Sequence, residues 1–161
     1  MAVVDEIFIA PGAGLPMLSV RTANVTATGL DGDRYASGKG SFSDYGNELR
    51  HVTVISADDI RHANAHLAVP FAPAETRRNI VVAGEVSLLD FIGREFAIGS
   101  VRLRGIEEAA PCRHPEKVAR KSGFRQAFKR RAGIMAEVVE PGRIRVGDEV
   151  KLVAAAVVAA E

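Results

Sequence analysis

The chain has 161 residues, of which 47% are hydrophobic and 25% are charged, and its formal net charge is +1. This composition is ordinary for a soluble globular protein, and a chain of this length can bury a core without disulfides. The longest nearly apolar run, 152–160, is about half as long as a membrane span, and the N-terminus lacks a signal-peptide pattern. These features exclude a membrane helix, and the single free cysteine favours the reducing cytoplasm.

The first half of the chain predicts short strands separated by glycine-rich turns. Strand patterns occur at 3–9, 18–20, 24–27 and 51–55. The stretch from Gly29 to Asn47 is rich in Gly, Ser and Asp, and we expect a long ordered loop there, because loops of this length are usually functional or disordered. Ser56 is a suitable N-cap for a helix over about 57–67.

A strand over 76–83 opens with two arginines, Arg77 and Arg78. Neighbouring residues of a strand point to opposite faces, so one arginine is expected to point into a barrel or toward its mouth. A buried guanidinium needs an anion or a carboxylate, and the acids at Asp31 and Asp33 are alternative internal partners.

The second half predicts one hairpin, a broken helical region and three closing strands. Gly99-Ser100 should join strands at 95–98 and 101–106, after a short helical turn within 86–91. The region 116–131 is expected to be mainly helical and bent near Gly123, with Phe124 and Phe128 facing inward. The closing strands are 134–139, 144–146 and 149–153.

About nine short strands with two or three helices favour a β-barrel or sandwich over an alternating βαβ fold. We predict a mainly β protein, a closed or nearly closed mixed β-barrel with two or three peripheral helices. No repeat or linker divides the chain, so we expect a single domain over 1–161, with its core at about 3–153 and a C-terminal tail at 154–161.

Cys112 is the only cysteine, and it lies between two prolines in Pro111-Cys112-Arg113-His114-Pro115. It cannot form a disulfide within the chain, so it is either a small buried hydrophobe or a thiol kept for chemistry. Arg113 and His114 would raise its thiolate fraction, which favours chemistry. Cys112 and His114 are therefore the candidate catalytic residues, although their spacing is poor for a hydrolase dyad.

The segment after Cys112 is strongly basic. Between 113 and 131 the only acid is Glu116, against eight basic residues: Arg113, Lys117, Arg120, Lys121, Arg125, Lys129, Arg130 and Arg131. This excess indicates a small anionic cofactor or substrate or, alternatively, a solvated helix face. The sequence has no zinc or P-loop motif, and we expect neither pyridoxal phosphate nor a nucleic-acid partner.

Four elements occur in an order that resembles the MOSC domain, the family named for the C-terminal domain of molybdenum cofactor sulfurase. They are Gly32-Asp33-Arg34, Arg77-Arg78-Asn79-Ile80-Val81-Val82 with Gly84, Pro111-Cys112, and Arg131-Ala132-Gly133 with the stretch 142–148. The resemblance covers roughly 20–152 and depends on the ordered set, since no single motif is specific. Tyr35 stands where the family commonly has histidine, so an acid or base role at that position does not carry over.

The resemblance implies a closed β-barrel that binds the molybdenum cofactor (molybdopterin) or transfers sulfur. It implies Cys112 as the metal ligand or sulfur carrier. The cofactor-binding residues would be Arg77, Arg78 and Arg131 on the pterin phosphate or an oxyanion, Asp33 and Asn79 as loop organisers or pterin contacts, and also Arg34 and Arg113.

Three functions stay open at this point. The first is a molybdenum-dependent oxidoreductase or sulfur transferase in which Cys112 is a soft ligand. The second is a metal-free persulfide carrier that receives sulfur at Cys112 from a donor protein. The third is a non-catalytic binding module that uses the basic segment 113–131. A sulfur donor or redox partner protein would accompany either of the first two.

Overall fold

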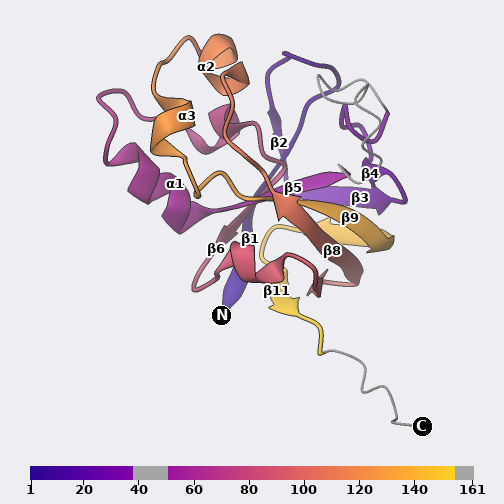
Figure 1. Cartoon of the computed structure of the whole chain (residues 1–161). Coiled ribbons are helices and arrows are strands. Elements are labelled where there is room, and N and C mark those ends of the chain that lie inside the picture. Colours follow the sequence, from indigo (N-terminus) through magenta and orange to yellow (C-terminus); the bar gives the residue numbers. More distant parts are fainter. Residues whose placement is uncertain (38–50, 155–161) are drawn as a thin grey trace, which may run out of the picture.

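Seven strands close into a barrel in the computed structural model, which describes residues 1–37 and 51–154 (Figure 1). The barrel order is β11-β7-β8-β9-β5-β6-β1, and β1 pairs with β11 to close it. Their bounds are β1 (Ala2–Ile9), β5 (Val52–Ser56), β6 (Ile80–Ala83), β7 (Glu95–Ile98), β8 (Val101–Glu108), β9 (Ile134–Glu140) and β11 (Glu149–Leu152). The predicted mainly β, barrel-type fold class is confirmed.

The remaining strands and helices lie around the barrel. The short strand β2 (Leu18–Val20) extends the sheet beside β1, and a small sheet has the order β10-β3-β4. These three are β3 (Thr22–Thr26), β4 (Gly29–Leu30) and β10 (Gly142–Arg145). The helices are α1 (Ala57–Asn64), α2 (His114–Ala119) and α3 (Phe124–Ala127), with the 3-10 turns η2 (Pro73–Thr76) and η3 (Leu88–Phe91).

The pair β5–β6 is parallel, while the other paired strands are antiparallel, so the barrel is mixed. A parallel pair needs a long crossover, and the segment with α1 and η2 supplies it. All five residues of β5 are buried, because its inner face lines the barrel core and its outer face is covered by helices. Strands covered on both faces are usually rich in apolar residues, and β5 follows this rule except at Thr53 and Ser56, which are buried polar residues.

Two apolar clusters follow from that arrangement. The barrel interior holds residues such as Val54, Ile80 and Phe96. The neighbours Ile55 and Val81 point outward into a second cluster, which contains the predicted inward-facing Phe124 and Phe128. The rings of these two phenylalanines stack at 4.3 Å, and both are fully buried. The second cluster therefore fixes α1 and α3 to the outside of the barrel, where Figure 1 shows the helices gathered on one side.

The helical prediction for 116–131 is wrong in extent. Arg120 has a left-handed backbone with φ of 55° and ends α2, and Gly123 has φ of 92° and precedes α3. The carboxylate of Glu116 accepts hydrogen bonds from the backbone N–H groups of Gly123 and Phe124, which stabilises the break. The chain is therefore broken near Gly123, which is one of the two forms expected there, but the two helices on either side of the break are short.

Two other boundaries differ from the prediction. Helix α1 ends at Asn64 rather than near residue 67, because the Asn64 side chain donates to the Phe71 carbonyl and accepts from the Phe71 N–H. The strand expected over 76–83 begins only at Ile80. Arg77 has a left-handed backbone with φ of 64°, so the idea that Arg77 and Arg78 face opposite sides of a strand is wrong.

Two of the predicted segments lie partly outside the residues that the structure describes. The long loop expected from Gly29 to Asn47 is described only as far as residue 37, and most of the expected tail at 154–161 lies outside the described residues. Among the described residues, no helix is long and apolar enough to cross a membrane.

Candidate functional site

A pocket of about 220 Å³ opens beside Cys112, whose side chain is half-buried in its wall. Arg78 lies on the same pocket, and so do residues from the loop before Cys112 and from strands β5 and β9. The lining residues are Tyr35, Thr53, Arg78, Ala109, Ala110, Pro111, Cys112 and Met135. The only thiol of the chain and one of the paired arginines therefore share a small cavity.

The loop that carries Cys112 is fixed to the corner before β9. Ala109 donates its backbone N–H to the Gly133 carbonyl at 2.9 Å. Arg78 donates through Nε to the Ala132 carbonyl at 2.7 Å and through Nη2 to the Ala109 carbonyl at 3.4 Å. Gly133 has φ of 87°, and a Cβ there would lie 2.0 Å from the Val54 carbonyl oxygen, so the corner requires glycine. Arg78 thus supports the Cys112 loop as well as lining the pocket.

Asn79 joins three strands beneath the pocket. Its Oδ1 accepts hydrogen bonds from the Thr53 N–H and hydroxyl, and its Nδ2 donates to the Phe8 carbonyl. Its own N–H donates to the Thr53 hydroxyl oxygen. Asn79 is fully buried, and these contacts occupy its amide. In this arrangement Asn79 organises the strand ends and presents no surface to a ligand.

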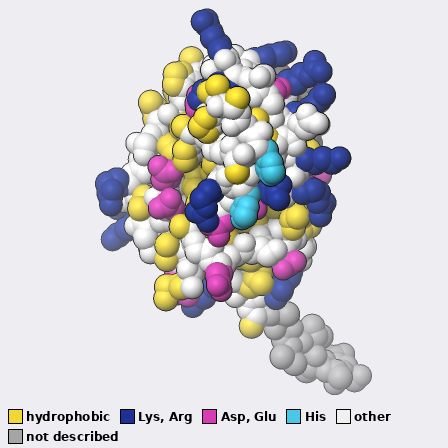
Figure 2. Space-filling view, turned by 90° about the vertical axis from the view of Figure 1, so that its left-hand side faces the viewer, with side chains coloured by type: hydrophobic (Ala, Val, Ile, Leu, Met, Phe, Trp, Pro, Cys, Tyr) yellow, Lys and Arg dark blue, Asp and Glu magenta, His cyan; other side chains and the backbone are white. Residues whose placement is uncertain are grey.

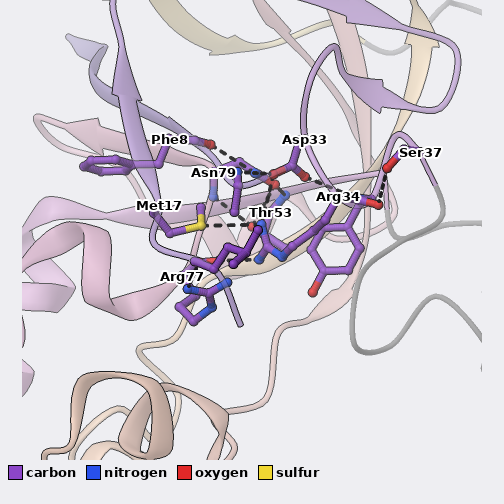
Figure 3. Close-up of polar contacts among 11 residues, drawn as sticks. Phe8, Met17, Asp33, Arg34, Ser37, Thr53, Arg77 and Asn79 are labelled. Carbon is purple, nitrogen blue, oxygen red and sulfur yellow. Dashed lines mark hydrogen bonds and ion pairs between the residues drawn. The ribbon is translucent and has the colours of Figure 1, made fainter. Parts of the chain in front are cut away.

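Asp33 and Arg34 form a buried ion pair in the glycine-rich loop. Oδ1 of Asp33 accepts from Arg34 Nη1 and from the Ala10 N–H, both at 2.9 Å, and Oδ2 accepts from the Tyr35 N–H at 3.2 Å. Arg34 also donates through Nη2 to the Arg77 carbonyl at 3.1 Å, and its guanidinium lies 4.4 Å from the centre of the Tyr35 ring. Figure 3 shows how this pair meets Arg77, Thr53 and Asn79.

Arg77 is buried, with 3% of its surface exposed, and most of its guanidinium has no partner. Nη1 donates to the Leu15 carbonyl at 2.7 Å, whereas Nε and Nη2 are buried and unpaired within the described part of the chain. Burial and the nearby charge of Arg34 lower the pKa of Arg77 to about 10, so it stays charged near pH 7. An unpaired buried cation is costly, which makes this position a candidate anion site.

His114 adds a group that can change charge beside these arginines. Burial lowers the pKa of His114, and the charges of Arg77, Arg34 and Lys117 lower it further. Its imidazole is therefore neutral near pH 7 and has one donor and one acceptor nitrogen. His114 begins α2, two residues after Cys112, so it links the thiol loop to the Arg34–Arg77 pair.

The structure does not bring every predicted site residue to this pocket. Arg113 is exposed on the N-terminal side of α2. Arg131 lies near Asp59 of α1, where burial raises the pKa of the Asp59 carboxyl and the charge of Arg131 opposes that rise. Sequence reasoning assigned no role to three residues that line the pocket: Tyr35, Thr53 and Met135. Of these three, only Thr53 could have been recognised from the sequence, because it is a polar residue within an apolar strand pattern.

The comparisons with known proteins agree with this geometry. A sequence model of the MOSC domain matches residues 42–151. The chain belongs to the MOSC domain family. The match covers β5 to β11 and the Cys112 loop, so the family resemblance inferred from the four motifs is confirmed. No curated protein matches the chain.

Three solved structures share the fold at low sequence identity. The YUAD protein from Bacillus subtilis is 18% identical, with a TM-score of 0.81, over 94% of this chain and 96% of that chain. YiiM from Geobacillus stearothermophilus is 14% identical, with a TM-score of 0.72, over 95% of this chain and 75% of that chain. YiiM from Escherichia coli is 17% identical, with a TM-score of 0.69, over 96% of this chain and 71% of that chain.

Proposed function

We propose that this MOSC domain binds the molybdenum cofactor with the Cys112 thiolate as the protein ligand of the metal. One observation carries the proposal: the only thiol lines a small pocket, and His114, two residues after that thiol, feels the charge of Arg77, a buried guanidinium beyond the pocket lining with two nitrogens unpaired among the described residues. A soft thiolate suits a thiophilic metal, and an unpaired buried cation suits the phosphate of a pterin. The residues present therefore fit the cofactor that the family implies.

Each residue has a distinct part in this proposal. Cys112 supplies one soft ligand, and the described residues contain no group of three His, Cys, Asp or Glu side chains that could hold a metal by themselves. Arg77 supplies the unpaired donors, and Arg34 adds positive charge behind it. Arg78 holds the Cys112 loop in place through backbone carbonyls. When bound, the cofactor would supply oxygen-atom or sulfur transfer chemistry.

Cys112 would act through its thiolate, which is the form of a thiol that binds metals. Burial and the charges of Arg77, Arg34 and Lys117 lower the pKa of His114, so its imidazole is neutral near pH 7 and offers one donor and one acceptor nitrogen beside the loop. The protein would thus hold Cys112 ready as a ligand and keep the phosphate end of the pterin at the arginines.

A metal-free persulfide carrier is the second candidate, and the single protein ligand favours it. In this case the Cys112 thiolate would attack the outer sulfur of a persulfide on a donor protein, forming a persulfide on Cys112 and releasing the donor thiolate. A nucleophilic acceptor would then take that outer sulfur and release the Cys112 thiolate. Both candidates require the same thiolate and the same cations, so metal content and labile sulfur must be measured together.

The test is purification from a host that makes the cofactor, followed by molybdenum analysis and persulfide labelling. We expect molybdenum near one atom per chain in the parent, none in Cys112→Ala, and little change in Ser122→Ala, an exposed position between α2 and α3 that does not line the pocket. Because a half-buried loop thiol contributes little to the core, Cys112→Ala should lower stability by no more than about 1 kcal/mol.

Two arginine variants sharpen this experiment. Arg77→Met should lower cofactor retention more than Arg131→Ala, because Arg77 has the unpaired buried nitrogens and Arg131 lies near Asp59. Labile sulfur without molybdenum would favour the carrier. A parent that holds neither, together with a Cys112→Ala variant that melts far below it, would make Cys112 structural and overturn both candidates.

A further inference from the structure

The segment from Arg113 to Arg130, here called the α2–α3 segment, presents its positive charge to solvent. Five of its cations are exposed and make no ion pair with a described residue: Arg113, Lys117, Arg120, Arg125 and Lys129. Its only acid, Glu116, is turned to the backbone N–H groups of Gly123 and Phe124. Figure 2 shows Lys and Arg side chains along the right-hand margin of the helical face, the side on which α2 and α3 lie.

Several cations elsewhere on the surface are paired. Arg102 and Arg104 pair with acids on neighbouring strands, namely Glu95, Glu137 and Glu140. Arg61 likewise pairs with Asp58 on α1. A smaller group of exposed cations without an ion pair to a described residue lies in and beside the β3–β10 sheet: Arg21, Arg143 and Arg145. The α2–α3 segment has the larger group, five such cations with its one acid turned to the backbone, and this creates a positive field there.

The backbone under these cations is held in place. Phe124 and Phe128 lie in the outer apolar cluster with Phe71, whose ring centre is 5.2 Å from that of Phe124. Lys121 donates to the Pro70 carbonyl and pairs with Glu75, which ties the segment to η2. A surface that is already ordered loses less conformational entropy when a partner binds.

Two exposed apolar residues lie in or beside the charged segment. Val118 on α2 is 37% exposed, and Val69, outside the segment but next to the Pro70 that Lys121 contacts, is 57% exposed. Protein interfaces combine an apolar centre with a polar rim. Nucleic-acid surfaces that stack bases need exposed aromatic rings, and both phenylalanines of the segment are buried. The chemistry of the segment thus fits a protein partner better than RNA or DNA.

We propose that the exposed cations of the α2–α3 segment form a docking surface for an acidic protein at the mouth of the Cys112 pocket. The occupant is a protein with a carboxylate-rich surface around a small apolar contact. Arg113 directly follows Cys112, so a partner docked here lies beside the thiol. The docking proposal is argued from the charge and exposure of the segment alone. Only the further idea that the docked partner delivers sulfur or electrons to Cys112 rests on the proposed function.

The first test is fluorescence anisotropy with a glutamate-rich peptide that has a central leucine. The triple variant Lys117→Glu, Arg125→Glu, Lys129→Glu reverses charge on the segment. Its matched control, Arg21→Glu, Arg143→Glu, Arg145→Glu, reverses three exposed cations in and beside the small β3–β10 sheet. We expect the segment variant to weaken peptide binding at least about tenfold at low salt, and the control to change it much less.

Three outcomes would overturn the proposal. The first is no peptide binding at low salt, and the second is equal weakening by both triple variants. The third is tighter binding of single-stranded oligouridylate of equal charge, which would assign the surface to nucleic acid. Circular dichroism of both triple variants checks that the fold is retained, because all six positions are exposed and lie outside the two apolar clusters.

The second test uses Cys112 as a reporter of the field at the pocket mouth. Its thiolate attacks a disulfide sulfur of the dianionic reagent dithiobis-nitrobenzoate, forming a mixed disulfide and releasing thionitrobenzoate. The segment variant should slow this reaction about tenfold at low salt and leave the neutral reagent dithiodipyridine unaffected. Equal slowing with both reagents would mean that the variant changes the reactivity of the thiol itself, and would overturn the attraction of anions to the pocket mouth by this surface.

The failure of this proposal can be distinguished from that of the proposed function. Cys112→Ala should bind the peptide like the parent even where it retains no molybdenum. Conversely, the segment variant purified from the cofactor-producing host should keep its molybdenum, because Arg77 and Cys112 are unchanged. Loss of peptide binding in Cys112→Ala would overturn the independence of the docking surface.

Discussion

Arg34 and Arg77 lie in the protein interior, whereas Lys117 and Arg125 stand in solvent on the α2–α3 segment. In water a cation needs no protein partner, so the unpaired state of Lys117 or Arg125 indicates only positive potential. In the interior an unpaired cation is costly, so the two Arg77 nitrogens that have no partner among the described residues are the donors that the proposed function assigns to an anion. The same residue type therefore indicates a ligand in one region and a steering field in the other.

The buried region itself contains a second contrast. The guanidinium of Arg34 pairs with Asp33 and donates to a backbone carbonyl, whereas the guanidinium of Arg77 makes one hydrogen bond within the described residues, to the Leu15 carbonyl. Both arginines are almost fully buried, at 3% exposure. We therefore expect Arg34 to support the structure and Arg77 to be available to a ligand, and two experiments address this difference.

The largest effect is expected from Arg34→Met. It removes the cation beside the buried Asp33 carboxylate and breaks the bond to the Arg77 carbonyl. Removing one partner of a buried ion pair leaves an uncompensated charge, so we expect a loss of about 3 kcal/mol in the free energy of unfolding. Urea denaturation measures this loss. The control is Arg113→Met at an exposed position, whose free energy of unfolding should lie within about 0.5 kcal/mol of the parent value. A loss below about 1 kcal/mol would mean that the ion pair does not support the loop.

Arg77→Met should behave in the opposite way. It removes a buried and largely unpaired guanidinium while keeping a side chain of similar length, so stability without ligand should stay equal or rise by about 1 kcal/mol. Inorganic phosphate should raise the melting temperature of the parent by mass action and leave that of Arg77→Met unchanged. Methionine also keeps the left-handed backbone strain at this position, so the variant isolates the charge. Equal phosphate responses would remove Arg77 from the anion site.

These contrasts also explain how far sequence alone could reach. Apolar runs and turn residues predicted the hairpin at Gly99-Ser100 and the short strand β2 correctly, because local signals decide both. The start of β6 was wrong, because hydrogen bonds of Asn79 to Thr53 and Phe8 position residues 77–79 from distant parts of the chain. Tertiary contacts override local preference at such positions.

The candidate site was predictable in kind but not in detail. The sequence identified Cys112 and the paired arginines, and the structure gathers them with His114 in one part of the fold. Sequence reasoning treated Arg77 and Arg131 alike, because the chain shows charge but not burial. Only the fold separates an arginine with unpaired buried nitrogens from one that lies near Asp59.

The smallest effect concerns Lys121, the cation of the α2–α3 segment that bonds both Glu75 and the Pro70 carbonyl. Burial alone would raise the pKa of Glu75, but hydrogen bonds from Lys121 and the Ala72 N–H, with the charge of Lys121, lower it below its usual 4.5. An acid with a lowered folded pKa stabilises the protein above its unfolded pKa and loses that contribution as pH falls through the folded value.

Lys121→Met should therefore cost about 0.5 kcal/mol near pH 7, the size expected for a partly exposed ion pair. The cost should shrink at an acidic pH below the lowered pKa of Glu75, where the protonated carboxyl attracts no cation. Urea unfolding at both pH values measures the difference, with the unpaired Lys117→Met as the matched control and no change expected for it at either pH. A cost for Lys121→Met that is equal at both pH values would assign its role to the bond with the Pro70 carbonyl. In that case Lys121 would differ from Lys117 through its hydrogen bond to a backbone carbonyl and not through an ion pair.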